Sequence, residues 1–469
     1  SRVIHTCPSG AVWRERVNKS GSTTRCHREQ VRNYATTRLR LLLGSTVLGS
    51  LFLGFLDNMS ASPSGILTLL GLLLAGPAVY GGKVVYRWLA LGHSGQSVGL
   101  TAGEGASSKQ PGREEVGTAE YVLGLVGYAI GIGNVWRFPY LVGKNGGCAF
   151  VLAYLVCLFL VAMPLYLLEL VLGQDTRAST IEAYRKLRPR WRSLGYAQGV
   201  MLFCALAYYN VLLAYACIYI LASLVTPLPW TKEAQAGTRL NNTSPAQWFW
   251  THEVLNVYDE LEGRGLGELQ WKIVVALLAV WLMVFFALAF GKKILAKVTW
   301  VTVVGPVLLI LILVAQTTVL DGAGDGIRFY IGKFDGSQLT KLDVWASACG
   351  QILFSLSPGC GTAITLSSFI KPNEDVYRVC VFVSLSNSIF SLTGGFAIFS
   401  ILGHLAHTSG RTVEELASQS GTGLAFISIA EGMNSFGGAA NAMAVLFFVM
   451  LLSLGLDSTF AWAETFNAM

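Results

Sequence analysis

Apolar runs long enough to cross a bilayer constrain the fold of this chain more than any other feature. About 20 apolar helical residues span the hydrocarbon core of a membrane. The runs do not alternate apolar and polar residues, as the strands of a membrane β-barrel do. The sequence therefore predicts an all-α polytopic membrane protein, with main spans near 119–143, 148–173, 194–224, 270–290, 296–320, 343–370, 376–406 and 437–464.

Composition agrees with this class. Of the 469 residues, 53% are hydrophobic and only 13% are charged, whereas soluble domains carry about 25% charged residues. The net charge of +7 comes from basic residues in short loops, so the lipid bilayer, and not nucleic acid, is the expected partner. The nine cysteines include no CxxC pair, which indicates neither a zinc site nor a disulfide framework.

The chain divides into four parts by composition. Residues 1–40 form a basic segment that we expect in the cytosol, and residues 41–91 hold two apolar helices. Residues 92–118 are rich in Gly, Ser and charge, which is typical of a flexible linker. Residues 119–469 contain the eight main spans.

Loop charges and sequons predict the same orientation in the membrane. The loop 175–193 is strongly basic and should be cytosolic. The loop 225–269 then lies outside, where Asn241 and Asn242 each begin an N-x-[ST] glycosylation sequon. We therefore expect a multi-pass glycoprotein of the plasma membrane.

Two spans are interrupted by residues that disfavour helix. One contains GYAIGIGNVWRFPY from Gly127, and the other contains the run SPGCG from Ser357. Non-helical backbone survives at membrane depth only where protein or a watery cavity satisfies its polar groups. Close helix packing explains a single small-residue motif, but it does not explain the flanking Asn, Ser and Arg. Two breaks five spans apart match inverted-repeat transporters, whose freed carbonyls bind Na⁺.

Four motifs resemble a known family. The stretch GYAIGIGNVWRFPYLVGKNGGCAF resembles the first-helix signature of the neurotransmitter:sodium symporters, the LeuT-type solute carriers. GQILFSLSPGCG, SLSNSIFSLTGGFAIFSILGH and LLSLGLDSTFA resemble the sixth, seventh and eighth helices. The resemblance implies a transporter core over 119–469, a LeuT-type inverted-repeat bundle with discontinuous first and sixth core helices. It also implies a symporter that couples Na⁺, together with Cl⁻, to uptake of an amino acid or a derivative of one.

The resemblance implies two sodium sites. The first would use the carbonyls of Gly127, Ile130 and Leu454 with the side chains of Asp457 and Ser458. A lone Asp in an apolar span is costly unless a cation pairs with it, although a neighbouring hydroxyl is an alternative partner. The second site would be built from oxygen ligands of Ala129, Asn134, Ser355 and Asn387.

A chloride site is implied beside the second sodium. Its members would all offer O–H or N–H donors, and they are Tyr154, Gln351, Ser355, Asn387 and Ser391. Chloride-independent relatives place Glu where this chain has Ser391, so the missing carboxylate implies that Cl⁻ supplies the negative charge. For any single hydroxyl, a bond to helix backbone remains the alternative.

The resemblance also implies a small-molecule amino-acid site. Amine carriers of the family have Asp at the position of Gly131, so a glycine there implies a substrate that brings its own carboxylate. Tyr209 would donate its hydroxyl to that carboxylate, and Phe354 would form a lid. The full set of implied contacts is Ala129, Gly131, Gly133, Ala205, Tyr209, Phe354, Ser357, Cys360 and Ser458.

Gates and the helix order complete the expectations. Arg137 and Asp57 match an outer-gate pair, with membrane-interface snorkelling as the alternative for Arg137. Glu169 should hydrogen-bond unwound backbone.

Residues 41–91 resemble the family's ninth and tenth helices, so circular permutation, a tandem-module piece and a faulty gene model all stay open. A non-transporting or incomplete family member is the alternative function. An enzyme is not indicated, because the spans hold no paired carboxylates or nucleophile–base set.

Overall fold

The computed structural model describes residues 4–6, 12–14, 118–235, 244–256, 269–289, 292–371, 374–417 and 424–469. The chain divides into two compact units, Ser1–Gly65 and Ile66–Met469. In the first unit, β1 (Ile4–Thr6) pairs antiparallel with β2 (Val12–Arg14), a hairpin that the sequence analysis did not predict. The two apolar helices of 41–91, the 92–117 part of the predicted linker, Asp57 and the sequons at Asn241 and Asn242 lie outside the described residues.

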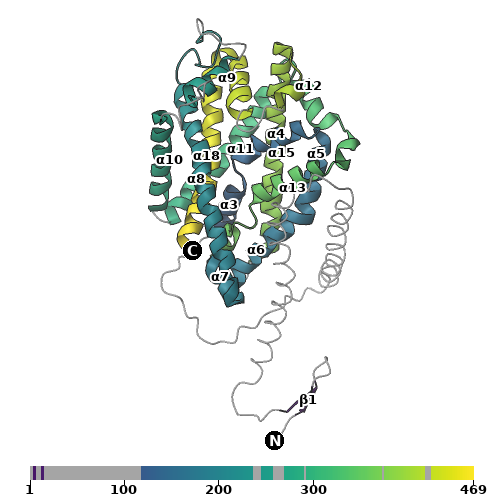
Figure 1. The fold of residues 1–469 in the computed structure, drawn as a ribbon, viewed down its shortest axis with the longest axis vertical. Coiled ribbons are helices and arrows are strands. Elements are labelled where there is room, and N and C mark those ends of the chain that lie inside the picture. The colour runs from purple at the N-terminus through teal and green to yellow at the C-terminus, as the bar shows by residue number, and fades with distance from the viewer. Residues whose placement is uncertain are drawn as a thin grey trace, which may run out of the picture. The chain divides into compact units, whose positions relative to one another are not determined.

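Long helices make up most of the described part of the second unit (Figure 1). α5 (Cys148–Cys157) continues through the π-turn η2 (Leu158–Ala162) into α6 (Met163–Thr176). The others are α8 (Arg192–Ala222), α10 (Trp271–Ala289), α11 (Lys292–Thr317), α15 (Val376–Ser409) and α18 (Ala440–Ala468). Within the described ranges, six helical stretches are long and apolar enough to cross a membrane. This finding confirms the predicted polytopic class.

Two further spans are broken, as the sequence predicted. α3 (Thr118–Ala129) stops before the short turn η1 (Ile132–Asn134), and α4 (Arg137–Lys144) resumes the path. α13 (Leu342–Leu356) and α14 (Thr362–Ser367) are separated by the SPGCG run. In that run Ser357, Gly359 and Gly361 have φ of 49°, 93° and 76°. Left-handed backbone cannot continue an α-helix, and it suits glycine because glycine lacks a Cβ.

Short elements cap the two ends of the bundle. α7 (Thr180–Leu187) and η3 (Pro189–Trp191) occupy the basic loop that was predicted to be cytosolic. The loop 225–269, which was predicted to be external, carries α9 (Pro245–Trp248) and η4 (Phe249–Val254). Other loops carry the remaining short elements: α12 (Ala323–Ile327), η5 (Arg328–Gly332), η6 (Gly336–Thr340), α16 (Val413–Ala417), η7 (Leu424–Ile429), α17 (Ala430–Met433) and η8 (Asn434–Ala439).

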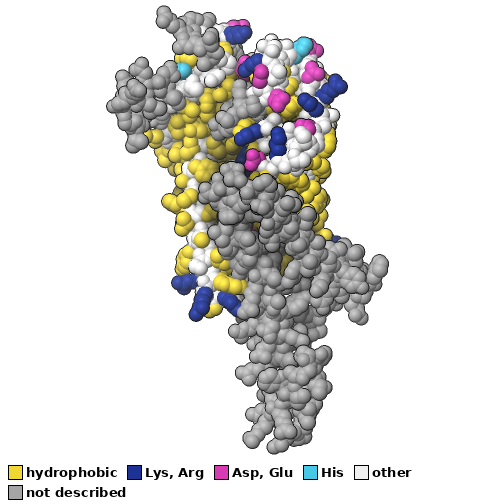
Figure 2. All heavy atoms as spheres, turned by 45° about the vertical axis from the view of Figure 1, so that its right-hand side comes forward, with side chains coloured by type: hydrophobic (Ala, Val, Ile, Leu, Met, Phe, Trp, Pro, Cys, Tyr) yellow, Lys and Arg dark blue, Asp and Glu magenta, His cyan; other side chains and the backbone are white. Residues whose placement is uncertain are grey.

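The outer surface of the bundle is apolar between two charged ends. On the face drawn in Figure 2, hydrophobic side chains form a band, with Lys, Arg, Asp and Glu side chains toward its upper end and Lys and Arg side chains at its lower end. α10 contributes strongly exposed side chains to such a surface, including Leu278 and Phe285. In water this surface would be unfavourable, whereas lipid tails solvate it.

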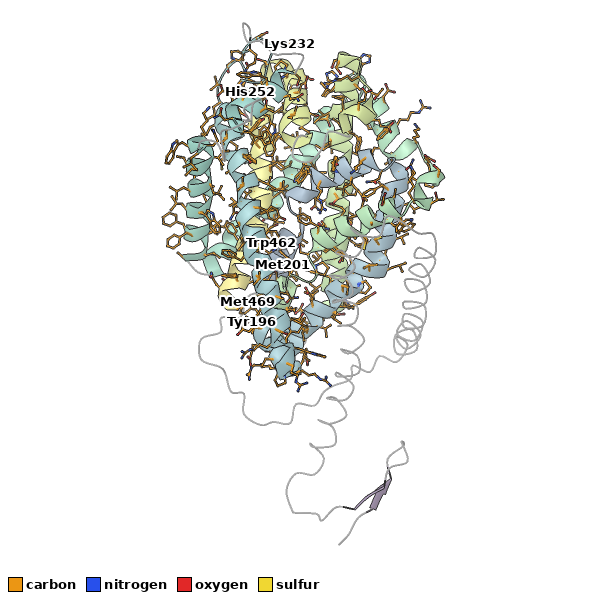
Figure 3. All side chains as sticks on the ribbon, in the orientation of Figure 1. Tyr196, Met201, Lys232, His252, Trp462 and Met469 are labelled. Atoms are coloured by element: carbon orange, nitrogen blue, oxygen red, sulfur yellow. The ribbon has the colours of Figure 1, made fainter. Side chains whose placement is uncertain are left out.

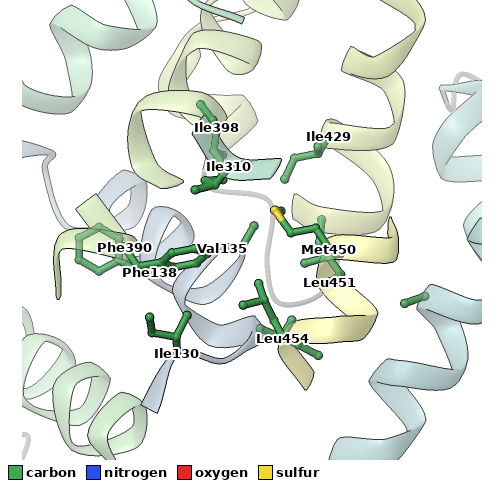
Figure 4. Close-up of a cluster of buried hydrophobic side chains, with 14 of the residues drawn as sticks. Ile130, Val135, Phe138, Ile310, Phe390, Ile398, Ile429, Met450, Leu451 and Leu454 are labelled. Carbon is green, nitrogen blue, oxygen red and sulfur yellow. The ribbon is translucent and has the colours of Figure 1, made fainter. Parts of the chain in front are cut away.

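The broken first span lies in the centre of the bundle. Figure 4 shows Ile130, Val135 and Phe138 packed beside Leu454 of α18 and Ile310 of α11. All five side chains are buried. The unwound segment is therefore enclosed by neighbouring helices on several sides, which keeps its free polar groups away from lipid.

Phe138 is a test of this packing. Its ring is fully buried and meets the Tyr154 ring edge-on at a centroid distance of 5.0 Å. Phe138→Ala should cost about 3–5 kcal/mol of stability, because it leaves a cavity. The expected result is a clearly lower thermal denaturation midpoint of the detergent-purified protein. The matched control Phe285→Ala removes a ring that is 63% exposed on α10, and it should leave the midpoint nearly unchanged. Equal effects of the two substitutions on the midpoint would contradict the buried position of Phe138.

Candidate functional site

Side chains from neighbouring helices satisfy the backbone of the second break. The Gly359 N–H donates to Glu169 Oε1 at 2.8 Å, which confirms the expectation for Glu169. Tyr128 donates to the Ser357 carbonyl at 3.3 Å, and Thr180 of α7 donates to the Gly361 carbonyl at 2.8 Å. The break is therefore stabilised by the surrounding structure, because partners from three other elements replace the lost helical hydrogen bonds.

The first break is held in the same way. The Gly131 N–H donates to Asn134 Oδ1 at 3.3 Å, which closes a tight local turn. The Ile132 N–H donates to the Tyr209 hydroxyl at 3.4 Å. A Cβ on Gly131 would lie 3.0 Å from Ser458 Oγ and 3.2 Å from the Tyr209 hydroxyl. The break therefore leaves no space for a side chain at position 131.

The residues predicted for the first sodium site come together. Asp457 is buried on α18, and its Oδ2 would lie 3.1 Å from a Cβ placed on Gly127. Ser458 Oγ donates to the Tyr128 carbonyl at 3.3 Å. Ile130 lies just past the end of α3, and Leu454 is buried one turn before Ser458 on α18. The carboxylate and the end of the broken helix therefore share one small region.

Asp457 has a hydroxyl partner that the sequence did not reveal. Thr302 of α11 donates to Asp457 Oδ1. The alternative partner considered for Asp457 is thus present, but one neutral hydroxyl does not neutralise a carboxylate. Among the side chains that the structure describes, no Lys or Arg forms an ion pair with Asp457. Thr302 is 155 residues away in sequence, so no spacing pattern could have indicated it.

Three side chains predicted for the second sodium site touch one another. Asn134 Nδ2 donates to Asn387 Oδ1 at 2.6 Å, and Ser355 Oγ donates to Asn134 Oδ1 at 3.2 Å. Ser355 Oγ is also 3.0 Å from Asn387 Oδ1. Ala129, whose carbonyl completes the predicted set, is the last residue of α3. η1, α13 and α15 thus bring several neutral oxygens to one point.

The predicted chloride residues lie around this cluster and are all buried. Ser391 donates to the Asn387 carbonyl at 3.2 Å, which is the backbone bond considered as the alternative for a single hydroxyl. Tyr154 shares a hydrogen bond of 3.1 Å with Ser388, a residue that the sequence analysis missed. Gln351 Nε2 donates to the Gly133 carbonyl at 3.4 Å, while its Oε1 is buried with no hydrogen-bond partner among the described residues.

A small cavity adjoins these residues. Its volume is about 20 Å³, which is room for about one water molecule. Seven of the nine predicted substrate contacts line it, together with Tyr128, Asn134, Ser355 and Trp462, which were not predicted as substrate contacts. The seven are Ala129, Gly131, Gly133, Tyr209, Phe354, Ser357 and Ser458. Ala205 and Cys360, which complete the predicted set, are not among its lining residues.

Gly133, Tyr209 and Phe354 line both this cavity and a larger one. The second cavity has a volume of about 330 Å³, and its other lining residues are Trp136, Arg137, Tyr208 and Leu212. The Arg137 guanidinium lies 4.5 Å from the centre of the Phe354 ring, a cation–π distance. Arg137 Nη1 is buried with no hydrogen-bond partner in the described ranges. The predicted lid and the predicted gate arginine are thus in contact.

Comparison with known proteins identifies the family. The model of the sodium:neurotransmitter symporter family matches residues 113–468. This chain belongs to that family. The symporter signatures found in the sequence therefore belong to one continuous match.

The chain is similar in sequence to several known transporters. It is 38% identical over 365 residues to a sodium- and chloride-dependent GABA transporter 2 of Rattus norvegicus, covering 74% of this chain and 60% of the relative. It is 36% identical over 391 residues to a sodium- and chloride-dependent taurine transporter of Bos taurus, covering 79% and 62%. A sodium-dependent serotonin transporter of Drosophila melanogaster is 35% identical over 364 residues, covering 74% and 57%. The chain thus spans about 60% of the length of these relatives.

A solved structure shares the fold. The crystal structure of MhsT in complex with L-phenylalanine superimposes with a TM-score of 0.63 at 24% sequence identity. The match covers 76% of this chain and 74% of MhsT. This family member therefore has the LeuT-type fold that the family resemblance implied.

Glu169 provides a test of how the second break is held. Glu169→Ala should destabilise the protein by about 1–3 kcal/mol, because it leaves the Gly359 N–H buried without an acceptor. The expected result is a lower thermal denaturation midpoint in detergent. Glu182→Ala is the matched control, since Glu182 forms an exposed ion pair with Arg185 on α7 and such pairs contribute little. A lower midpoint for Glu182→Ala but not for Glu169→Ala would contradict the role of Glu169 at the second break.

Proposed function

We propose that this protein is a secondary active symporter that couples Na⁺, together with Cl⁻, to the uptake of an amino acid or a derivative of one in the plasma membrane. Asp457 carries the proposal. It is a buried carboxylate that has no basic partner among the described side chains, and it lies beside the end of a broken helix. A hard cation such as Na⁺ fits this set of oxygens, because it would pair with the charge and use the carbonyls.

A second ion fits the cluster of Asn134, Ser355 and Asn387. The cluster is neutral, so the charge that balances its cation must come from a ligand. A substrate carboxylate bound near Gly131 would lie close to both the cluster and the Tyr209 hydroxyl, because the Gly131 N–H bonds Asn134 and its missing side chain faces Tyr209. This arrangement supports an amino acid as substrate over an amine without a carboxylate.

Chloride would add a second negative charge in this low-dielectric region, where charges interact strongly. The hydroxyls of Tyr154, Ser355 and Ser391 are donors suited to an anion. Rotation of the Gln351 amide would turn its Nε2 toward the side where Oε1 now has no partner. The named GABA and taurine relatives are sodium- and chloride-dependent, which supports the same coupling here.

In the proposed mechanism, the Na⁺ gradient drives a conformational change around the central site. Each Na⁺ that enters down the membrane potential releases about 2.3 kcal/mol of free energy per 100 mV. This energy would drive the substrate uphill while the bundle rocks around the central site. Phe354, which lines both cavities, and Arg137, which lies over its ring, would close the outer path.

Sodium coupling is tested with the purified chain in sealed proteoliposomes. Amino-acid uptake should need an inward Na⁺ gradient, and Asp457→Ala should abolish the Na⁺ stimulation because the cation loses its charged partner. Asp343→Ala is the control, since Asp343 is exposed at the start of α13, and it should retain stimulation. Amino-acid uptake that does not depend on Na⁺ would refute sodium coupling. Sodium-dependent binding with no flux would favour a non-transporting sensor.

Chloride coupling has its own test. Replacement of chloride by gluconate should reduce uptake, and Ser391→Glu should lessen this dependence because the new carboxylate supplies the missing negative charge. Ser391→Ala is the control, because it removes the hydroxyl without adding charge, and it should keep the dependence. Wild-type uptake that is unchanged in gluconate would contradict the chloride assignment.

A further inference from the structure

Two thiols from neighbouring helices lie together near the candidate chloride residues. Cys157 is the last residue of α5 and is 7% exposed, and Cys349 is half-buried on α13. The two thiols share a hydrogen bond, and both cysteines are free of disulfides. Tyr154 lies one turn before Cys157, and Gln351 lies two residues after Cys349. Each helix thus carries one of the thiols beside one of the predicted chloride residues.

Helix packing brings the two cysteines to the same level of the bundle. An isolated bridge between Gly147 and Phe334 joins the chain just before α5 to the loop that leads into α13. At about 1.5 Å of rise per residue, Cys157 lies about 13 Å from the start of α5 and Cys349 about 10 Å from the start of α13. The two helices pack against each other, and Figure 1 shows them side by side. The contact between the thiols therefore agrees with the course of both helices.

The thiol pair lies within the membrane region. α5 begins the stretch Cys148–Thr176, which is long and apolar enough to cross a membrane. A depth of about 13 Å is well inside a hydrocarbon core about 30 Å thick, where charged molecules are strongly disfavoured. An organic hydroperoxide is uncharged and dissolves in lipid, so this class of oxidant suits the half-buried thiol of Cys349.

One hydroperoxide molecule is enough to join the two thiols. Its O–O bond breaks, one thiol sulfur takes up an oxygen to become a sulfenic acid, and an alcohol leaves. The second thiol then attacks the sulfenic sulfur, an S–S bond forms, and the oxygen leaves as water with the proton of the second thiol. Two thiols are oxidised by two electrons in all, and the hydroperoxide is reduced by two. Thiols that already touch need only a small approach to reach the S–S distance of about 2.0 Å.

A disulfide here would join two segments that each end at an irregular turn. The π-turn η2 follows Cys157 directly, and α13 ends where Ser357 adopts a left-handed conformation. Helices bend at such irregularities more readily than within regular turns. The bond would therefore tie α5 to α13 on the same side of both irregular turns. It would also hold Tyr154 and Gln351 at one spacing.

We propose that Cys157 and Cys349 are a modification site, which a lipid-soluble organic hydroperoxide converts to a disulfide that stops transport. The site itself depends only on the packing of α5 against α13. Its effect on transport rests on the proposed function, because the bond blocks the relative movement of two helices around the candidate chloride residues. Reduction of the disulfide restores that movement.

The modification is tested by mapping the thiols of the full chain in proteoliposomes. The wild-type protein is treated with cumene hydroperoxide, its remaining thiols are blocked with N-ethylmaleimide, and linked peptides are identified by mass spectrometry. We expect one pair of peptides joined through Cys157 and Cys349, which dithiothreitol separates. Cys157→Ala and Cys349→Ala should each remove this pair.

Cys204→Ala is the matched control, because it removes an exposed thiol from α8. Figure 3 labels Met201, which lies one turn before Cys204, and the same view in Figure 1 shows α5 and α13 farther to the right. The control should therefore form the linked peptides as the wild type does.

Uptake measures the effect on transport, with radiolabelled GABA and the standard amino acids as probes. After hydroperoxide, Na⁺-dependent uptake by the wild type and by Cys204→Ala should fall in proportion to the linked fraction. Dithiothreitol should restore it. Cys157→Ala and Cys349→Ala should keep their uptake under the same treatment, because neither can form the bond.

The two measurements separate the outcomes. Treated wild type in which both thiols remain open to N-ethylmaleimide would overturn the modification site, and this result requires no variant to fold. A linked pair with unchanged uptake would overturn the effect on transport. The absence of Na⁺-dependent uptake before any treatment would instead count against the proposed function, while the linked peptides would still decide the modification site.

Discussion

The structure depends on how the polar backbone of two broken helices is satisfied inside the membrane. Lipid offers no hydrogen bonds, so every freed N–H or carbonyl must find a protein partner or a bound ion. Glu169 accepts from Gly359, Tyr209 accepts from Ile132, and Asn134 accepts from Gly131. Asn134 belongs to the first break itself, but Glu169 and Tyr209 come from surrounding helices, so the breaks depend on the assembled bundle. The breaks in turn create the central site.

Charge balance connects the candidate ion sites to the proposed substrate. Asp457 is buried, and Thr302 gives it a hydrogen bond without giving it a counter-charge. The Asn134, Ser355 and Asn387 cluster is neutral, so its cation would need an external negative charge. A carboxylate from the substrate and a chloride among the surrounding hydroxyls would provide it. In this proposal ions and substrate bind together, because each reduces the electrostatic cost of the others.

Shared walls connect the small cavity to the larger one. Gly133, Tyr209 and Phe354 line both cavities, and the Arg137 guanidinium lies over the Phe354 ring. Trp462 packs against Tyr209 and lines only the small cavity. In the proposed mechanism, Phe354 and Arg137 are therefore placed to control passage between the two cavities.

The sequence by itself determined the class of protein, the two breaks and most of the site. Long apolar runs admit only membrane helices, and helix breakers at membrane depth require a cavity, so local composition was enough for these features. The family signature pointed to Asp457, Asn134 and Phe354, and the structure brings these residues together beside the breaks. Only the tertiary structure revealed Thr302, Ser388 and Trp462, and it also showed that Ala205 and Cys360 do not line the cavity. These contacts join distant helices, and the rotation of each helix about its axis is decided by packing against its neighbours.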